Sequence, residues 1–223
     1  MHRTIAHCVP EDAKELALAH HTIFSRGPVY HTIYAGVDQA IVIKTYEKRV
    51  SNLITEQTSL DPDREVHFLK IVGDGSDEIM AYIIWIYMPH GYDHAKDPQE
   101  STADFPADSN MPVVEDFKQM LRVVRGDDEG RKGPHFLLAL LGTHPKHERK
   151  GAATMLVKWI FERADKEQLP CYVDSSRTGH ALYERLGFRD FGKACVDLDK
   201  FEGGNGAGLQ TWYAMKREPQ KEL

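Results

Sequence analysis

Cysteines are scarce in this sequence, and their spacing excludes two classes of protein. Only three occur among the 223 residues, Cys8, Cys171 and Cys195. An odd count without a Cys-x-x-Cys pair does not suit a disulfide-stapled secreted domain or a cysteine-based zinc site. We therefore expect free thiols and a reducing compartment, namely the cytoplasm.

Long apolar runs and an excess of positive charge are also missing. The N-terminal segment MHRTIAHCVPEDAKEL has no apolar core, so we expect no signal peptide. The longest apolar run, residues 79–88, is far shorter than the roughly 20 residues that span a bilayer. The formal net charge of −6 argues against a protein that binds nucleic acid through phosphate contacts. Without repeats or Ser-rich linkers, residues 1–223 are expected to form a single soluble domain.

What the sequence does contain is an alternation of helical and strand patterns. Apolar residues at helical spacing predict helices over residues 11–24, 38–55, 150–168 and 178–186. Shorter apolar runs predict strands over residues 64–72, 78–88, 135–142, 171–176, 188–198 and 210–216. The first two strands flank the turn signal GDGS and form a hairpin, and residues 25–37 are predicted to be a loop. This order predicts an α/β domain with a mixed sheet.

Residues 89–133 interrupt the alternation. They hold four prolines, ten acidic and six basic residues, so their net charge of −4 is most of the chain's −6. A long insertion of this kind is either disordered or a functional flap. Residues 113–125 within it predict a helix with an apolar stripe. The stripe consists of Val113, Phe117, Met120, Leu121 and Val124. Because a disordered linker needs no such stripe, we expect the helix to cover the substrate cleft or to form a dimer contact, and the protein to fold without the insertion.

The stretch HPKHERKGAATML, residues 144–156, places a basic turn in front of a helix. A helix N-terminus has unpaired N–H groups and a partial positive charge, and Gly151, Ala152 and Ala153 are small enough to let an anion reach the backbone. The other interpretation is a solvated loop whose small residues let the helix pack on the sheet. Spacing alone does not choose between the two.

Two motifs resemble the GCN5-related N-acetyltransferase (GNAT) family. Residues 148–153, ERKGAA, resemble the loop that binds the pyrophosphate of acetyl-CoA, in which Arg or Gln is followed by two residues, Gly, one residue and Gly or Ala. Residues 181–188, ALYERLGF, resemble the family's LYEKLGF block at the usual separation. The order of predicted elements also follows the family, and residues 197–208, DLDKFEGGNGAG, resemble a tail of fungal members. The resemblance covers most of the chain except residues 89–133.

The resemblance implies the GNAT fold, a mixed, mostly antiparallel central sheet that is splayed at the cofactor site and flanked by helices, here with a long insertion. It implies acetyl-CoA as co-substrate and no metal. The implied cofactor-binding residues are Leu141, Gly142, Thr143, Arg149, Lys150, Gly151, Ala152, Ala153, Thr154 and Ser176. Two positions depart from the family pattern. Glu148 replaces Arg or Gln, so we expect its side chain to point away from the pyrophosphate, and Ser176 replaces an Asn.

The resemblance further implies an N-acetyltransferase in which an amine attacks the thioester directly. Tyr183 occupies the family's position for the acid that protonates the departing thiolate, and a phenol is neutral at pH 7. Without the resemblance, Tyr183 would be interpreted as a core residue. For the base we favour Asp174, which shares a strand face with Ser176. Further candidates are His67, His135 and His144.

Two rival motifs are weaker. His144, His147 and Glu148 lie close together, but His-x-x-His on a loop without further ligands is a weak zinc pattern. Residues 203–208, GGNGAG, fit a dinucleotide-binding motif only loosely and follow no strand-to-helix context. We expect them to form a flexible loop near the substrate mouth.

The alternative to an enzyme is a non-catalytic CoA-binding or interaction protein on the same fold. For an enzyme, the expected partner is a small-molecule or peptide amine, with no nucleic acid and no membrane, and with a homodimer as one outcome. The acidic insertion would favour a cationic amine if it lies over the site.

Overall fold

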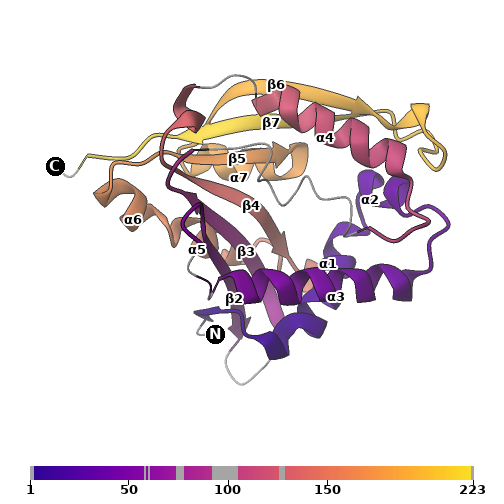
Figure 1. Cartoon of the computed structure of the whole chain (residues 1–223), viewed down its shortest axis with the longest axis horizontal. Coiled ribbons are helices and arrows are strands. Elements are labelled where there is room, and N and C mark those ends of the chain that lie inside the picture. Colours follow the sequence, from indigo (N-terminus) through magenta and orange to yellow (C-terminus); the bar gives the residue numbers. More distant parts are fainter. Residues whose placement is uncertain are drawn as a thin grey trace.

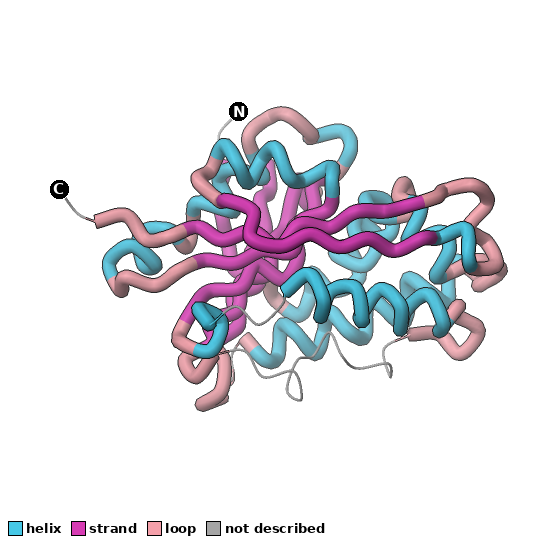
Figure 2. Tube along the Cα trace, turned by 90° about the horizontal axis from the view of Figure 1, so that it is seen from above, coloured by secondary structure: helices cyan, strands magenta, loops and turns pink. Residues whose placement is uncertain are grey.

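A seven-stranded sheet forms the centre of the protein. The computed structural model describes residues 3–57, 59, 61–73, 78–91, 105–125 and 129–221. Within them the strands lie in the order β1-β2-β3-β4-β5-β7-β6, and helices flank both faces of the sheet (Figures 1 and 2). In the described sheet only β4 and β5 pair in parallel, and the other neighbours are antiparallel. The predicted fold class is confirmed.

The elements have the following bounds. The strands are β1 (Arg3–His7), β2 (Glu65–Gly73), β3 (Ile79–Met88), β4 (His135–Thr143), β5 (Cys171–Ser176), β6 (Arg189–Asp197) and β7 (Leu209–Arg217). The α-helices are α1 (Ala13–Phe24), α2 (Pro28–Ile33), α3 (Gln39–Glu56), α4 (Met111–Arg125), α5 (Ala152–Lys158), α6 (Phe161–Lys166) and α7 (Arg177–Arg185). Short 3-10 helices are η1 (Pro10–Asp12), η4 (Glu129–Lys132), η5 (Pro145–His147) and η6 (Leu198–Lys200).

Three local predictions differ from the structure. Strand β1 was not predicted, because its five residues at the sheet edge show little burial contrast. The predicted loop 25–37 contains α2, a six-residue helix that begins at a proline, which suits the first helical turn. The predicted helix 150–168 is interrupted between α5 and α6, where the N–H of Trp159 bonds to the carbonyl of Leu156, three residues back, and tightens the turn.

Helices cover both faces of the sheet, which explains the continuous apolar run of β3. On one face α5, α6 and α7 pack over a core that includes Trp85, Phe136 and Leu156. On the other face α1 and α3 pack over a core that includes Phe68 and Tyr82. Because both faces are covered, nine of the ten residues of β3 are buried.

The central parallel pair opens along its length. Strand β5 pairs with β4 at only three positions, Phe136 with Cys171, Leu137 with Tyr172 and Leu138 with Val173. Beyond them the end of β4 pairs with β3 alone, and the end of β5 pairs with β7 alone. The sheet is therefore splayed between residues 139–143 and residues 174–176, as the family resemblance implies.

Helix α4 confirms the helix predicted inside the insertion, and it packs on the sheet. It contacts β6 and β7, across which it lies in Figure 1. Val113, Met120 and Val124 of its stripe are at most 5% exposed. Gly192 on β6 allows the approach, because a Cβ there would lie 2.2 Å from the carbonyl oxygen of Val124. The stripe thus belongs to the core and is not available as a dimer contact, so we now expect loss of α4 to destabilise the fold. The rest of the insertion at 92–104 and 126–128 lies outside the described residues.

The structure describes the cysteines and the length of the helices as follows. The three cysteines are free, with Cys8 and Cys171 buried and Cys195 exposed. Among the residues that the structure describes, no helix combines the length and apolar character that a membrane span requires.

Candidate active site

The end of β4 forms one side of the splay. Leu141, Gly142 and Thr143 are its last residues, and beyond Leu138 their strand has no partner on the β5 side. Gly142 lies in a tightly packed place, because a Cβ there would lie 3.1 Å from both Ile23 Cδ1 and Tyr82 Cε1. The structure therefore brings the three predicted strand residues to the open end of the sheet.

The loop between β4 and α5 forms a basic turn next to this opening. Arg149 and Gly151 adopt positive φ angles of 59° and 86°, and α5 begins at Ala152. A positive φ is readily adopted by glycine and rarely by other residues. Arg149, Lys150 and Gly151 are exposed, whereas Ala152 is buried against the core. The backbone at the start of α5 is therefore accessible from solvent, next to the cationic side chains of Arg149 and Lys150.

A third cation at this turn was missed by the sequence analysis. The Arg3 guanidinium donates a hydrogen bond to the carbonyl of Lys150, and its Nη1 lies 3.6 Å from where a Cβ on Gly151 would be. No local signal links residue 3 to residue 150. The contact depends on β1 joining the sheet at its edge.

Glu148, which departs from the family pattern, is held by a cation. Its Oε1 lies 2.5 Å from Nη1 of Arg26, in the turn after α1, and both side chains are about half exposed. The pair offsets the negative charge of Glu148 in the turn. Its effect is modest, because exposed ion pairs contribute about 0–1 kcal/mol.

Tyr183 lies on α7, which packs on β5 and β7. Its side chain is buried, and its ring meets that of Phe188 edge-on at a centroid distance of 5.6 Å. Gly179 makes room for the ring, since a Cβ there would lie 3.0 Å from Tyr183 Cε2. Burial raises the pKa of Tyr183, so the phenol keeps its proton at neutral and mildly alkaline pH. The side chain is therefore a core residue and at the same time a neutral donor.

Ser176 lies at the end of β5 that is not paired with β4, on the other side of the splay from residues 139–143. It ends β5 and is the N-cap of α7, and it is partly exposed. Its hydroxyl is therefore carried by the strand that diverges from β4.

Asp174 does not have the surroundings that we expected for a base. Its Oδ2 accepts a hydrogen bond from Arg125 Nε at 2.7 Å, and its Oδ1 accepts one from Arg131 Nη2 at 3.1 Å. The three side chains are 9%, 3% and 5% exposed. Because both oxygens are occupied and covered, we interpret the carboxylate as a structural anchor, and its role as the base stays a prediction. Strand alternation identified the face of Asp174 but not the α4 segment that covers it.

Two of the other base candidates lie away from the open end. His67 is on β2, where its Nε2 is 3.0 Å from Glu65 and its ring is 5.0 Å from that of Trp159. His135 begins β4, is fully buried and has Nδ1 within 2.8 Å of the carbonyl of Gly133. Neither is placed to serve a substrate at the splay.

His20 is a partly exposed histidine that the sequence analysis did not select. Its Nδ1 is 2.8 Å from the hydroxyl of Tyr82, the residue that packs against Gly142. Its ring stacks on Tyr46 at a centroid distance of 3.5 Å. Burial lowers the pKa of His20 well below its usual value, so the ring is neutral at neutral pH. The available signal was a histidine on the apolar stripe of α1, in register with Leu16.

An open cavity of about 580 Å³ lies between α2 and the loop that joins β6 to β7. Its lining comes from α2 and the residues after it, and from the loop between β6 and β7. The lining residues are Pro28, His31, Tyr34, Ala35, Gly36, Gly203, Gly204 and Asn205. The ring of Tyr30 lies 4.6 Å from Tyr34 and 6.4 Å from His20, so aromatic side chains connect the cavity to His20. The glycine-rich loop thus borders a cavity.

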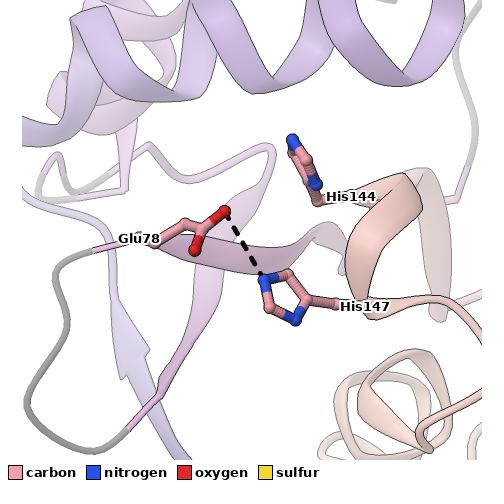
Figure 3. Close-up of side chains that lie close together, drawn as sticks. All are labelled: Glu78, His144 and His147. Atoms are coloured by element: carbon pink, nitrogen blue, oxygen red, sulfur yellow. Dashed lines mark ion pairs between the residues drawn. The ribbon is translucent and has the colours of Figure 1, made fainter.

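The weak zinc pattern is rearranged in the structure. His144 and His147 lie close to Glu78, just before β3 (Figure 3), whereas the carboxylate of Glu148 pairs with Arg26. His144 is therefore part of a separate cluster at the start of the basic turn.

Comparison with known proteins agrees with this geometry. Residues 76–188, just over half of the chain, match the profile of the acetyltransferase (GNAT) family. No curated protein matches the sequence. Arylalkylamine N-acetyltransferase 2 from Aedes aegypti has a similar structure, with a TM-score of 0.65 at 10% identity over 99% of this chain and 100% of that one. The histone acetyltransferase HPA2 and related acetyltransferase from Corynebacterium glutamicum has a TM-score of 0.62 at 16% identity, over 100% and 99%. The PaiA N-acetyltransferase from Thermoplasma acidophilum in complex with coenzyme A has 0.50 at 15%, over 98% and 99%. At these identities the likeness shows the fold.

Proposed function

We propose that this chain, which belongs to the GNAT acetyltransferase family, transfers the acetyl group of acetyl-CoA to the nitrogen of an amine. The observation that carries the proposal is the splay between β4 and β5. It leaves strand backbone without a sheet partner next to an exposed basic turn. An extended, amide-bearing arm that ends in phosphates fits such a site, because the arm can pair with the strand end while the phosphates reach the turn.

In this proposal the predicted cofactor residues act mainly through their backbone. Leu141, Gly142 and Thr143 hold the pantetheine arm, and the N–H groups at the start of α5, from Ala152 to Thr154, hold the pyrophosphate. Arg149 and Lys150 add charge, and the hydroxyl of Ser176 contacts the arm from the β5 side. Each charge-assisted hydrogen bond contributes about 1.5–3 kcal/mol.

Gly151→Asp should abolish the thermal stabilisation that acetyl-CoA gives to the wild-type protein. The substitution places a side chain and a negative charge where the pyrophosphate approaches, and a ligand stabilises the native state only if it binds. Gly206→Asp is the matched control, since Gly206 also has a positive φ, 77°, and open space around it. Differential scanning fluorimetry with and without acetyl-CoA measures both. An undiminished shift in a folded Gly151→Asp protein would place the cofactor elsewhere.

The proposed reaction needs one proton acceptor and one proton donor. A lysine-like ammonium must first lose one proton to solvent, which costs roughly 4–5 kcal/mol at pH 7. The neutral amine nitrogen then attacks the thioester carbonyl, loses its second proton as the amide forms, and the C–S bond breaks. We assign this second proton to Nε2 of His20, whose Nδ1 is oriented by Tyr82, and the proton gained by sulfur to the hydroxyl of Tyr183, which is reprotonated as His20 gives up its proton after product release.

His20→Asn should lower kcat by about 10²-fold, the lower end of a general-base contribution, and leave acetyl-CoA binding unchanged. Asn keeps a polar group that can bond to Tyr82 but cannot accept the proton. His21→Asn is the matched control, because His21 is the next residue and forms a similar 2.8 Å contact with the hydroxyl of Tyr30. Release of free thiol under saturating substrates measures kcat. Equal rates in the two variants would exclude His20 as the acceptor.

The cavity between α2 and the β6–β7 loop is our candidate for the acceptor site. Among its lining residues are Pro28, Tyr34 and Ala35, and none is acidic. This lining suits an amine that carries an aromatic or aliphatic group rather than a second charge. We therefore expect a small apolar amine as acceptor.

A panel of amines tests the function directly. Purified protein is incubated with acetyl-CoA and an arylalkylamine, an alkylamine, a polyamine, an amino sugar or a peptide, and free thiol is followed. We expect the highest kcat/KM for the first two. A preference for the polyamine would contradict the acceptor site, and absence of turnover with every amine, despite acetyl-CoA binding, would favour the non-catalytic CoA-binding protein.

A further inference from the structure

Glu78, His144 and His147 form a cluster at the start of the basic turn. Strand β3 begins at Ile79 and runs antiparallel to β4, which ends at Thr143, so the residues flanking these ends come together. The register is fixed by the hydrogen bond from the N–H of His144 to the carbonyl of Met80, at 2.9 Å. One ligand atom from each of the three side chains lies within 4.8 Å of the other two, and in Figure 3 Glu78 and His147 face each other with His144 beside them.

His147 carries an independent sign that something is missing from this cluster. Its side chain is only 14% exposed, and both of its ring nitrogens are buried without a hydrogen-bond partner. The nearest carboxylate oxygen, Oε1 of Glu78, is 3.6 Å from Nε2, which is too long for a hydrogen bond. Buried polar atoms almost always have a partner, and an ion is one explanation for an exception.

We propose that Glu78, His144 and His147 bind a transition-metal ion of the Zn²⁺ class. Two imidazoles and one carboxylate are ligands that Zn²⁺ uses with water as the fourth. Mg²⁺ and Ca²⁺ prefer oxygen ligands throughout, so they fit less well. The sequence alone gives only a weak zinc pattern at residues 144–148, because the third ligand, Glu78, precedes β3 and is distant in the chain.

Binding requires only small movements of side chains. Tetrahedral coordination at zinc–ligand distances of about 2.0–2.2 Å brings ligand atoms to about 3.3–3.6 Å from one another. The Glu78 side chain is 46% exposed and can turn. Lys146 Nζ lies 3.9 Å from Glu78 but is 74% exposed, so it can withdraw. Nδ1 of His144 accepts a long hydrogen bond of 3.3 Å from the N–H of Lys146. If the metal binds Nε2 of His144, this hydrogen bond remains. If the metal binds Nδ1, the metal–nitrogen bond takes its place.

A bound ion would link His144 and His147, at the start of the turn, to Glu78, just before β3. The second half of the same turn contains Arg149 and Gly151, so the ion would lie on the segment that we assign to the cofactor. The metal site itself does not depend on that assignment, because it follows from side chains that are close together without acetyl-CoA.

Zinc binding to the purified, chelator-stripped protein without a histidine tag tests the proposal. We expect isothermal titration to give one Zn²⁺ per chain, Co²⁺ to give the absorption of a tetrahedral site, and Zn²⁺ to raise the melting temperature. His147→Ala and Glu78→Gln should weaken Zn²⁺ binding, by about 100-fold or more for the histidine, since even outer-shell changes cost 10–100-fold. Glu78→Gln alters a half-exposed side chain and preserves its shape, so the test does not depend on the stability of the histidine variant.

His90→Ala is the matched control, because it removes an exposed histidine outside the cluster and should leave the affinity unchanged. The chain has 12 histidines, so weak binding alone is not support. Wild-type protein that does not bind Zn²⁺ saturably would overturn the proposal. So would equal affinities in wild type, His147→Ala and Glu78→Gln, which would identify an adventitious ion only.

Discussion

Tyr183→Phe should lower turnover by roughly 10²–10⁴-fold while acetyl-CoA binds nearly as tightly as in the wild type. The substitution removes one oxygen from a side chain that is 5% exposed and keeps the ring that packs on Phe188. If Tyr183 donates its proton to the departing sulfur, its loss leaves a thiolate to depart unprotonated, which raises the barrier of that step alone. Binding of the cofactor, which rests on the β4 end and the basic turn, is not affected.

The hydroxyl of Tyr183 is suited to this role over a wide pH range. Burial raises its pKa, so the protonated form persists and deprotonation of this acid should not limit the rate in mildly alkaline solution. A decline in rate there would have to come from another group.

Free-thiol release and cofactor-dependent melting temperature measure the two effects separately. Tyr172→Phe is the matched control, because it removes another fully buried phenol oxygen, on the strand segment that is still paired with β4. Wild-type turnover in Tyr183→Phe would leave the residue as a packing group. Loss of acetyl-CoA binding together with turnover would show instead that the hydroxyl shapes the cofactor site.

The sequence predicted those parts of the fold whose signal is local. The hairpin of β2 and β3 follows from two apolar runs around a turn, and the start of α5 follows from a glycine and two alanines after a basic turn. Helix α4 was found from its stripe, but the stripe indicates only that an apolar partner exists. That the partner is β6 and β7 depends on Gly192, which is distant from α4 in the sequence.

The sequence predicts the part of the candidate site that comes from one continuous segment. It does not predict the residues that separate segments bring together. The turn with Arg149 and Gly151 is one continuous motif, so it was found. Arg3, His20 and Glu78 come from β1, from α1 and from the residue before β3, and their positions follow from strand pairing and helix packing. Asp174 is a different case. Alternation along β5 shows that its side chain is on the same face as Ser176, but the residues that cover this side chain, Arg125 and Arg131, lie in the insertion.

Asp174→Asn should lower the free energy of unfolding by about 3–5 kcal/mol, the usual cost of removing one partner from a buried ion pair. The carboxylate is the shared partner of Arg125 and Arg131, and these guanidinium groups are 3% and 5% exposed. Asn has nearly the same shape but no charge, so both guanidinium groups lose their ion pair with residue 174. For a chain of this size the melting temperature should fall by roughly 6–20 °C.

Chemical denaturation of Asp174→Asn and of a matched surface variant measures this cost. Asp190→Asn is that control, because its carboxylate pairs with His180 at 2.8 Å but is 44% exposed, where a pair contributes about 0–1 kcal/mol.

The same variant separates an anchoring role from a catalytic one. Arg125 ends α4, and the start of α4 shares an apolar cluster with Ile33 of α2, the helix that lines the acceptor cavity. Loosening α4 should therefore raise KM for the amine and leave acetyl-CoA binding unchanged, in a protein that is measurably less stable. The contrary result is that Asp174→Asn keeps the stability of the wild type and lowers kcat with KM unchanged. That result would show that Asp174 acts on the substrate, and Asp174 rather than His20 would be assigned as the general base.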